Sequence, residues 1–158
     1  MAVTVEQESP LNGEVAGLVR QLNEYLSALT PDEFNYFMSV EEMNEPATTL
    51  FVARNEDGKA VGIGAMRRED AGIAEVKRMF TLPEVRGQGV GGKLLDAIIK
   101  LAQDEGVDKL VLETGNDHPE AWRLYESRGF TRCGPVLDYP DSEWSVFYEK
   151  PLQASQAA

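Results

Sequence analysis

Cysteine and histidine are nearly absent from this sequence, which holds one of each, Cys133 and His118. A single cysteine cannot form a disulfide within the chain. One cysteine and one histidine also supply too few ligands for the usual zinc sites, so the sequence predicts no metal centre. A thiol nucleophile at Cys133 would need a basic partner, and His118 is the one imidazole available. The composition therefore disfavours disulfide-stapled, zinc-dependent and cysteine-nucleophile proteins.

Positive charge and long apolar runs are also scarce. The chain carries 15 Lys and Arg against 27 Asp and Glu, which gives a formal net charge of -12 and a pI near 4.5. Nucleic acids and anionic membranes bind basic surfaces, so the composition argues against both as main partners and fits a cationic substrate better. No stretch has the length and apolarity of a membrane-spanning helix or a signal-peptide core. A soluble, cytoplasmic protein is therefore expected.

What remains is the composition of a globular domain. The chain has 158 residues, of which 42% are hydrophobic and 27% charged, and this suits one domain with a single core. We expect the domain to span residues 3–152 and residues 153–158 to form a frayed tail.

A glycine-rich stretch, residues 86–93, stands out between two apolar segments. Glycine has no Cβ, so a ligand oxygen can approach the backbone closely and several N–H groups can turn inward together. The apolar residues that follow recur with helical spacing, at Val90, Leu94, Leu95, Ile98, Ile99 and Ala102. The glycines therefore lie at a helix N-terminus, where the helix dipole also favours negative charge. The stretch predicts an anion-binding loop with a phosphate as its ligand.

Two common phosphate-binding motifs match this stretch incompletely. Gly87 to Lys93 fits the G-x-x-x-x-G-K of a P-loop, but Leu94 stands where a Mg²⁺-binding hydroxyl is required. Glycines 87, 89 and 92 also fit the dinucleotide fingerprint G-x-G-x-x-G, with Glu113 near the place of a ribose-binding acid. That fingerprint requires a strand running straight into the first glycine, whereas Pro83 makes the preceding segment a loop. A dinucleotide-dependent oxidoreductase would also need a larger sheet than this chain can supply.

Hydrophobic periodicity and turn signals predict an alternating order of strands and helices. We expect a short first strand within residues 1–8, and further strands at 48–54, 59–67, 73–80, 109–114, 130–133 and 143–150. Helices are expected at 13–29, from the Thr30 to Glu33 cap to about Met43, at 89–105 and at 119–128. A right-handed crossover through the helix at 89–105 makes the strand at 109–114 parallel to the one at 73–80.

Two motifs in this order carry a resemblance to a known family. Arg86-x-x-Gly89-x-Gly91 matches the Q/R-x-x-G-x-G/A pattern of the GNAT superfamily of acetyl-CoA-dependent N-acetyltransferases. Residues 121–130 are similar to the A-x-x-L-Y-x-x-x-G-F segment that follows in that family. The resemblance covers about residues 3–152. It implies an α+β fold with a central mixed, mostly antiparallel sheet, a splayed parallel strand pair and flanking helices.

The resemblance also implies an activity. Members of the family use acetyl-CoA as cosubstrate, without a metal, and transfer the acetyl group directly to a primary amine in a ternary complex. A small-molecule amine is the acceptor that we expect here, with a protein N-terminus or lysine as the alternative. A non-catalytic acyl-CoA-binding module is an alternative of another class. A homodimer, common in the family, is an open alternative to a monomer.

Family positions also imply cosubstrate-binding residues. The loop would hold the pyrophosphate through Arg86, Gly87, Gln88, Gly89, Val90, Gly91 and Gly92. The strand before it would pair with the pantetheine arm and face the thioester oxygen, through Met79, Phe80 and Thr81. His118 stands where the family commonly carries an Asn that touches the cosubstrate, and Asn116 is a nearby substitute. A pantetheine contact and a proton relay are both open for His118, although its place before Pro119 favours an exposed loop position.

Proton transfer is implied for two residues. Tyr125 matches the family tyrosine that protonates the coenzyme A thiolate, while a tyrosine that only packs under the cosubstrate is the alternative. Glu75 resembles the family's commonest glutamate base, with Glu113 as a substitute. The alternative for Glu75 is a surface carboxylate paired with Lys77 or Arg78.

The acceptor pocket of this family lies between the first two helices and the last strand pair. Acidic and aromatic residues in these segments are candidates for binding an amine, namely Glu33, Phe34, Tyr36, Tyr139, Asp141 and Trp144. Glu113, in the strand expected at 109–114, is a further candidate. These residue types suit an amino acid, a polyamine or an aminoglycoside.

Overall fold

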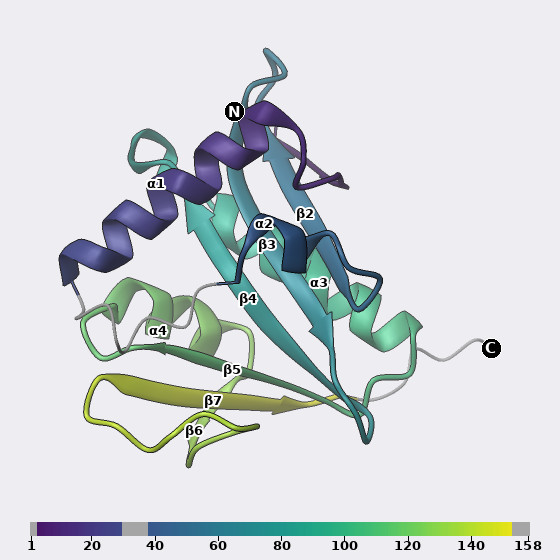
Figure 1. Ribbon diagram of the computed structural model, residues 1–158, viewed down its shortest axis with the longest axis vertical. Helices are drawn as coiled ribbons and strands as arrows, with labels where there is room; N and C mark the ends of the chain where they lie inside the picture. The colour runs from purple at the N-terminus through teal and green to yellow at the C-terminus, as the bar shows by residue number, and fades with distance from the viewer. Residues whose placement is uncertain (1–2, 30–37, 153–158) are drawn as a thin grey trace.

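The computed structural model describes residues 3–29 and 38–152. Its strands form one mixed sheet in the order β1-β2-β3-β4-β5-β7-β6, with a single parallel pair between β4 and β5 (Figure 1). The strands are β1 (Thr4–Gln7), β2 (Thr48–Arg54), β3 (Ala60–Arg68), β4 (Ile73–Thr81), β5 (Lys109–Gly115), β6 (Thr131–Cys133) and β7 (Ser145–Pro151). The expected α+β fold is confirmed; β1 lies within its predicted segment, and every bound of the other strands lies within two residues of its prediction.

Helices cover both faces of the sheet. The helices are α1 (Gly13–Leu29), α2 (Val40–Met43), α3 (Val90–Asp104) and α4 (Pro119–Ser127), and a short 3-10 turn (Pro83–Val85) precedes the glycine loop. In Figure 1 α1 and α2 lie in front of the sheet and α3 lies behind it. Accordingly α1 packs on β3 and β4, α2 packs on β2, and α3 packs on β1 to β4. None of the described helices has both the length and the apolarity needed to cross a membrane.

The two long helices form because their apolar residues recur along one face. In α1 this face consists of Val15, Leu18, Val19 and Leu22, all buried. In α3 it consists of Val90, Leu94, Leu95, Ile98 and Ala102, also buried. Burial of a side chain of this size contributes about 1.5–3 kcal/mol, so these stripes fix both helices against the sheet.

The parallel pair separates after its first residues. Cα partners run only from Ile73 and Lys109 to Glu75 and Val111, while β5 continues to pair with β7 up to Gly115. A register shift between Ile63 and Ala65 marks a bulge in β4, where Arg78 adopts φ 57. A bulge bends the strand that carries it, and Figure 1 shows β4 and β5 diverging from a common end. The expected splayed pair is therefore present.

The second helix differs from its prediction. Its expected cap at Thr30 to Glu33 lies outside the described residues, but residues 38 and 39 are not helical, so one helix does not run to Met43. A new helix begins at Val40 behind Ser39, whose hydroxyl accepts from the N–H of Glu42 at 3.1 Å. The Glu42 carboxylate accepts from the N–H of Ser39 at 3.2 Å. This capping box starts a helix of its own, and the S-x-x-E spacing in the sequence was its signal.

Candidate active site

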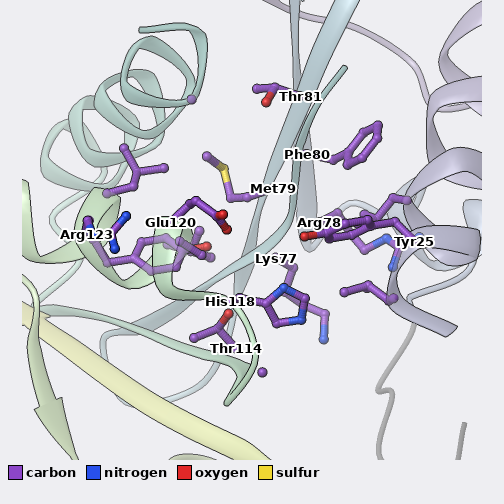
Figure 2. A pocket seen from close by; sticks show the side chains of 18 of the residues that line it. Tyr25, Lys77, Arg78, Met79, Phe80, Thr81, Thr114, His118, Glu120 and Arg123 are labelled. Carbon is purple, nitrogen blue, oxygen red and sulfur yellow. The ribbon is translucent and has the colours of Figure 1, made fainter. Parts of the chain in front are cut away.

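One cavity of about 530 Å³ occupies the space between the diverging strands. Its walls come from α1, β4, the glycine loop, β5, α4 and the segment between β6 and β7. Figure 2 shows Tyr25 of α1 on one side, Arg123 of α4 on the other, and β4 residues Lys77 to Thr81 between them. The sheet would be closed here if β5 had stayed paired with β4, so the cavity is a direct product of the splay.

The glycine loop presents its backbone to this cavity. Gly87 and Gly89 have φ values of 83 and 81, in the left-handed region, and a Cβ at either position would have no neighbouring atom within 4 Å. Gly89 is the N-cap of α3, and the first N–H bonded back to the loop is that of Lys93, to the Gly89 carbonyl at 3.1 Å. The earlier N–H groups of the first turn have no carbonyl partner among the described residues. The loop is therefore built to accept an anion.

The next two glycines bring α4 against α3. A Cβ at Gly91 would lie 3.2 Å from the Leu124 side chain, and one at Gly92 would collide with the Arg128 guanidinium. Arg128 in turn pairs with Asp96 of α3 at 3.1 Å. Gly91 lines the cavity together with Gly92, so the loop and α4 form one continuous wall.

Side chains of the loop are held locally. The Arg86 guanidinium lies over the rings of Tyr25 and Phe80, at 5.1 and 5.9 Å from their centroids, which joins the loop to α1. The Gln88 amide donates to the Glu84 carbonyl at 3.3 Å. Gln88 is not part of the cavity wall, whereas Arg86 is.

The strand before the loop runs along the cavity. Met79, Phe80 and Thr81 all line it, and β4 has no strand partner on its β5 side beyond Glu75 among the described residues. Backbone groups on that side are consequently available to a ligand that lies along the strand.

A cluster around Glu75 closes the other end of the cavity. Glu75 is 4% exposed, and its Oε2 accepts from the Tyr139 hydroxyl at 2.5 Å. The Lys77 ammonium donates to that hydroxyl at 2.8 Å and lies 3.6 Å from Glu75 Oε2. Burial raises the pKa of Glu75 above its usual value, and the nearby Lys77 cation and the Tyr139 hydroxyl offset only part of this rise. The surface alternative for Glu75 is therefore wrong, although Lys77 is its ion-pair partner.

Glu113 projects into the same end from β5. It is half-buried, and its Oε2 accepts from the Ser145 hydroxyl at 2.7 Å. Burial raises the pKa of Glu113 to about 6, against the opposing effects of Ser145 and Lys77. A carboxyl with this pKa is ionised at neutral pH and still basic enough to take up a proton.

Tyr125 lies in the wall between the loop and the carboxylates. It is 6% exposed, lines the cavity, and packs against Phe130 and Tyr148 with ring centroids 5.8 and 6.0 Å away. Burial, and then the charge of Glu113, raise the pKa of the phenol, so it stays protonated at neutral pH. The geometry is open to both a proton donor and a packing residue.

His118 is not the exposed loop residue that its place before Pro119 favours. It is 6% exposed, lines the cavity, and its ring lies 5.7 Å from that of Tyr25. The ring occupies space that a Cβ at Gly115 would fill. Burial lowers the pKa of His118, and its Nε2 has no hydrogen-bond partner among the described residues.

The other predicted positions divide into three groups. Tyr139 and Trp144 line the cavity. Asn116 does not line it: its amide donates to the Glu143 carbonyl. Asp141 is also absent from the wall. Glu33, Phe34 and Tyr36 lie outside the described residues.

Sequence reasoning missed several residues of the wall, among them Tyr25, Lys77 and Arg78. Tyr25 belongs to the apolar stripe of α1, and Lys77 follows Glu75 by two positions, so each has an ordinary structural explanation. Arg78 is 8% exposed, donates to the Asn23 side chain, and burial lowers its pKa to about 10. Its inward placement depends on the bulge, and nothing in the sequence around Arg78 signals a bulge.

Comparison with known proteins agrees with this geometry. The profile of the Acetyltransferase (GNAT) family matches residues 12–130, which include the glycine loop, both diverging strands and α4. The chain belongs to the GNAT acetyltransferase family. It is therefore an acyltransferase, and the resemblance seen in the two sequence motifs is confirmed.

Individual relatives support the assignment along almost the whole chain. An IAA acetyltransferase of Azospirillum brasilense is 38% identical over 95% of this chain and 98% of its own length. The uncharacterized N-acetyltransferase YsnE of Bacillus subtilis is 35% identical over 85% of this chain and 92% of its own length.

Solved structures share the fold. A protein provisionally described as an acyl-CoA N-acyltransferase, from Klebsiella pneumoniae, superposes with a TM-score of 0.81 at 29% identity, over 95% of this chain and 97% of its own. The PaiA N-acetyltransferase of Thermoplasma acidophilum, in complex with coenzyme A, gives a TM-score of 0.77 over 96% of this chain and 100% of its own. At its 16% identity, this second likeness concerns the fold alone.

GNAT acetyltransferases take their acetyl group from acetyl-CoA, and the described residues fit that cosubstrate. Its pyrophosphate needs backbone donors, which the open positions at Gly87 and Gly89 expose at the start of α3. Its amide-containing arm needs an unpaired strand edge, which β4 offers beyond Glu75. Among the described residues no cluster of His, Cys, Asp and Glu has the arrangement of a metal site.

Proposed function

We propose that this GNAT protein transfers the acetyl group of acetyl-CoA directly to a primary amine of a small molecule, with both substrates bound together. The observation that carries the proposal is the single cavity that joins the glycine loop to Glu75 and Glu113. An anion cradle at one end and carboxylates at the other suit a reaction between two ligands held side by side. Cys133 lies outside this cavity, so the lining residues favour direct transfer over a thiol-bound acetyl group.

Acetyl-CoA supplies the activated acetyl group when bound. The backbone of residues 86–92 would hold its pyrophosphate, and residues 79–81 of β4 would pair with its arm. His118 would support the arm from the opposite wall, because the residue lines the cavity and its buried Nε2 has no protein partner among the described residues. Gln88 and Asn116 are secondary candidates, since neither side chain reaches the cavity wall.

The remaining chemistry is proton transfer. A lysine-like amine has a pKa near 10.4 and is protonated at neutral pH, so a proton must leave before the nitrogen can attack. Glu75 and Glu113 are the carboxylates that line the cavity near Tyr139. Tyr125 would donate its phenolic proton toward the departing sulfur.

An amine acceptor follows from the charge of this end of the cavity. Buried Glu75 and half-buried Glu113 face one ammonium group, that of Lys77, so at neutral pH this cluster carries an excess negative charge that attracts a cation. Tyr139 and Trp144 add aromatic surface beside it. The cavity of about 530 Å³ must also hold the acetyl-CoA arm, so the space left for the acceptor suits a small amine. The Azospirillum relative, named an IAA acetyltransferase, is consistent with a small acceptor.

Calorimetric titration with acetyl-CoA tests the cosubstrate, with NAD and ATP as control ligands. We expect acetyl-CoA alone to bind. Gly89→Asp places a carboxylate in the cradle and should weaken binding at least tenfold. Gly58→Asp is a matched control, because Gly58 has the same φ of 81 and equally open surroundings in the turn between β2 and β3. Binding of NAD or ATP in place of acetyl-CoA, or equal affinities in both variants, would overturn the assignment of the loop.

Release of coenzyme A thiol then tests the acceptor. Tryptamine, putrescine and lysine represent small amines, and a short peptide with a free N-terminus and a lysine represents protein acceptors. Turnover with a small amine supports the proposal. Turnover with the peptide alone would replace it with protein acetylation, and tight acetyl-CoA binding without any turnover would favour a non-catalytic module.

A further inference from the structure

The two carboxylates of the cavity have different surroundings. Glu75 has two partners at one oxygen: the Tyr139 hydroxyl donates to its Oε2 at 2.5 Å, and Lys77 lies 3.6 Å from the same atom. Lys77 also donates to Tyr139 at 2.8 Å and lies 5.5 Å from the centroid of its ring. Glu75, Lys77 and Tyr139 thus form a closed triangle that fastens the segment between β6 and β7 onto β4.

Glu113 has one such contact. Ser145 donates to its Oε2 at 2.7 Å, and no described residue hydrogen-bonds to its Oε1. The last residue of β5 that pairs with β4 is Val111, two residues before Glu113, so the Glu113 side chain lies in the gap between the strands. Glu113 is half-buried, whereas Glu75 is 4% exposed. In both residues the contacts fall on Oε2, but Glu113 is the more exposed of the two and lacks a cationic partner within ion-pair distance among the described residues, so it is the more accessible carboxylate for an incoming amine.

We propose that Glu113 is the residue that takes the proton of the acceptor amine, and that Lys77 and Tyr139 hold Glu75 as a fixed anion with a positioning role. This inference rests on the proposed function and decides between the two carboxylates that it leaves open. Glu75 then anchors the β6–β7 segment and attracts the ammonium group, while Glu113 is the catalytic residue. Lys77, which belongs to neither sequence motif, then distinguishes the two carboxylates, because it pairs with Glu75.

The proton path connects Glu113 with Tyr125. The ammonium group gives up two protons in the reaction: Glu113 takes the first, keeps it until the sulfur has left and then releases it to solvent, and the nitrogen loses the second as the N–C bond forms. The C–S bond breaks, and the thiolate sulfur gains one proton, donated by Tyr125, which recovers it from the nitrogen through solvent. The charge of Glu113 raises the pKa of Tyr125, so protonation of Glu113 makes the phenol a better donor at the moment the sulfur leaves.

The titration of Glu113 is set by groups on four elements. Glu75 and Lys77 face it from β4, Ser145 from β7, Tyr125 from α4, and Tyr139 from the β6–β7 segment. Burial raises its pKa to about 6, Ser145 and Lys77 lower it, and Glu75 raises it. Lys77 lowers the pKa of Glu75 as well, so removal of this cation raises the pKa of both carboxyls.

The kinetic test compares Glu113→Gln with Glu75→Gln, using acetyl-CoA and the most active of tryptamine, putrescine and lysine. For the wild type, kcat/KM should fall about tenfold per pH unit below pH 6. Glu113→Gln should lower kcat about a hundredfold and abolish this acid limb, the fall of kcat/KM below pH 6. Glu75→Gln should raise the amine KM and keep the limb, and Lys77→Gln should move it to higher pH. Loss of the limb in Glu75→Gln, with the limb kept in Glu113→Gln, would assign the base to Glu75 and overturn the proposal.

A titration without turnover separates this proposal from the proposed function. Carbon-13 NMR of side-chain-labelled glutamates follows both carboxyls, whose signals are assigned by their loss in the two Glu→Gln variants. Glu113 should titrate near pH 6. The division of labour requires Glu75 to lose its proton before Glu113 does, and Tyr139→Phe, which removes only the hydroxyl, should raise the midpoint of Glu75. A midpoint for Glu75 above that of Glu113 would refute the division of labour even in a protein that acetylated no amine.

Discussion

Tyr125 is the residue at which burial and chemistry conflict most directly. A buried phenol beside Glu113 has a raised pKa and is a weak acid, yet it remains protonated and keeps one O–H to donate. A departing thiolate is a strong hydrogen-bond acceptor, so the donor acts when charge develops on sulfur and not before. This explains how one tyrosine can pack in the core and still serve the reaction.

Tyr125→Phe should therefore lower kcat about a hundredfold with little change in acetyl-CoA affinity, because the hydrogen bond is made mainly in the transition state. Steady-state thiol release with calorimetric binding measures both quantities. Tyr148→Phe is the control: Tyr148 is fully buried, donates to Glu126 at 2.6 Å, and lies outside the cavity. Unchanged turnover in Tyr125→Phe would leave Tyr125 as a packing residue.

Ionised Glu113 should lower the free energy of unfolding above pH 6. Its folded pKa of about 6 exceeds the usual 4.5, so the native state binds the proton more tightly and stability falls as pH rises between these values. The difference corresponds to at most about 2 kcal/mol, since one pKa unit equals about 1.4 kcal/mol. Urea unfolding should show Glu113→Gln to be more stable than wild type at pH 8 and equal to it at pH 4.

The control for this comparison is Glu84→Gln, because Glu84 is 61% exposed and pairs with Lys59 across 3.7 Å. A surface change of this kind should shift stability by less than about 0.5 kcal/mol at either pH. Equal stability of Glu113→Gln and wild type at pH 8 would contradict a raised pKa for Glu113.

At the scale of elements, an ion-pair network places α1 on the sheet. Arg54 of β2 donates to both oxygens of Glu8 at 2.7 Å and to Glu14 in the first turn of α1 at 2.8 Å. The other oxygen of Glu14 accepts from the backbone N–H of Ala60 at 2.8 Å. Because α1 carries Tyr25 into the cavity wall, this network supports the site from a distance.

Arg54→Met keeps the aliphatic stem and leaves both carboxylates without their cation. We expect a loss of about 2 kcal/mol in the free energy of unfolding, since hydrogen bonds to charged groups contribute about 1.5–3 kcal/mol. Lys100→Met is the control: its pair with Asp104 lies on the surface of α3, with Lys100 76% exposed, and should contribute less than about 0.5 kcal/mol. Equal losses in the two variants, measured by urea unfolding, would count against a special role for Arg54.

At the scale of the whole molecule, net charge opposes the cosubstrate. A protein of charge -12 repels the anionic acetyl-CoA at long range, while the glycine loop attracts it at contact. Salt screens the first effect more than the second, because the Debye length shortens from about 30 Å at 0.01 M to about 10 Å at 0.1 M. The local cradle is thus needed to bind an anion on an acidic protein.

The association rate of acetyl-CoA should accordingly rise about two- to tenfold between 0.01 and 0.1 M salt. Stopped-flow fluorescence measures it, and pantetheine, which carries no charge, should show no salt dependence. A rate that falls with salt would mean that local cations such as Arg86 govern the approach, and not the net charge.

Local signals in the sequence determined the family, the glycine loop and most element bounds. The helix at 13–29 is predicted to the residue, because its apolar face repeats within the helix itself. Gly87 and Gly89 were identifiable because their function depends on their own backbone. The capping box of Ser39 and Glu42 was a local signal as well, although the predicted helix from Thr30 to Met43 did not make use of it.

Only the tertiary structure decided how the site is completed. Tyr139 lies 62 and 64 positions from Lys77 and Glu75, so no local pattern could place the three in one triangle. Gly115 and the neighbouring α1 bury His118, whereas its own surroundings in the sequence favour exposure. Sequence periodicity determines which face of an element is apolar. Pairing, bulges and the separation of β4 from β5 determine which side chains meet, because these depend on contacts between segments far apart in the chain.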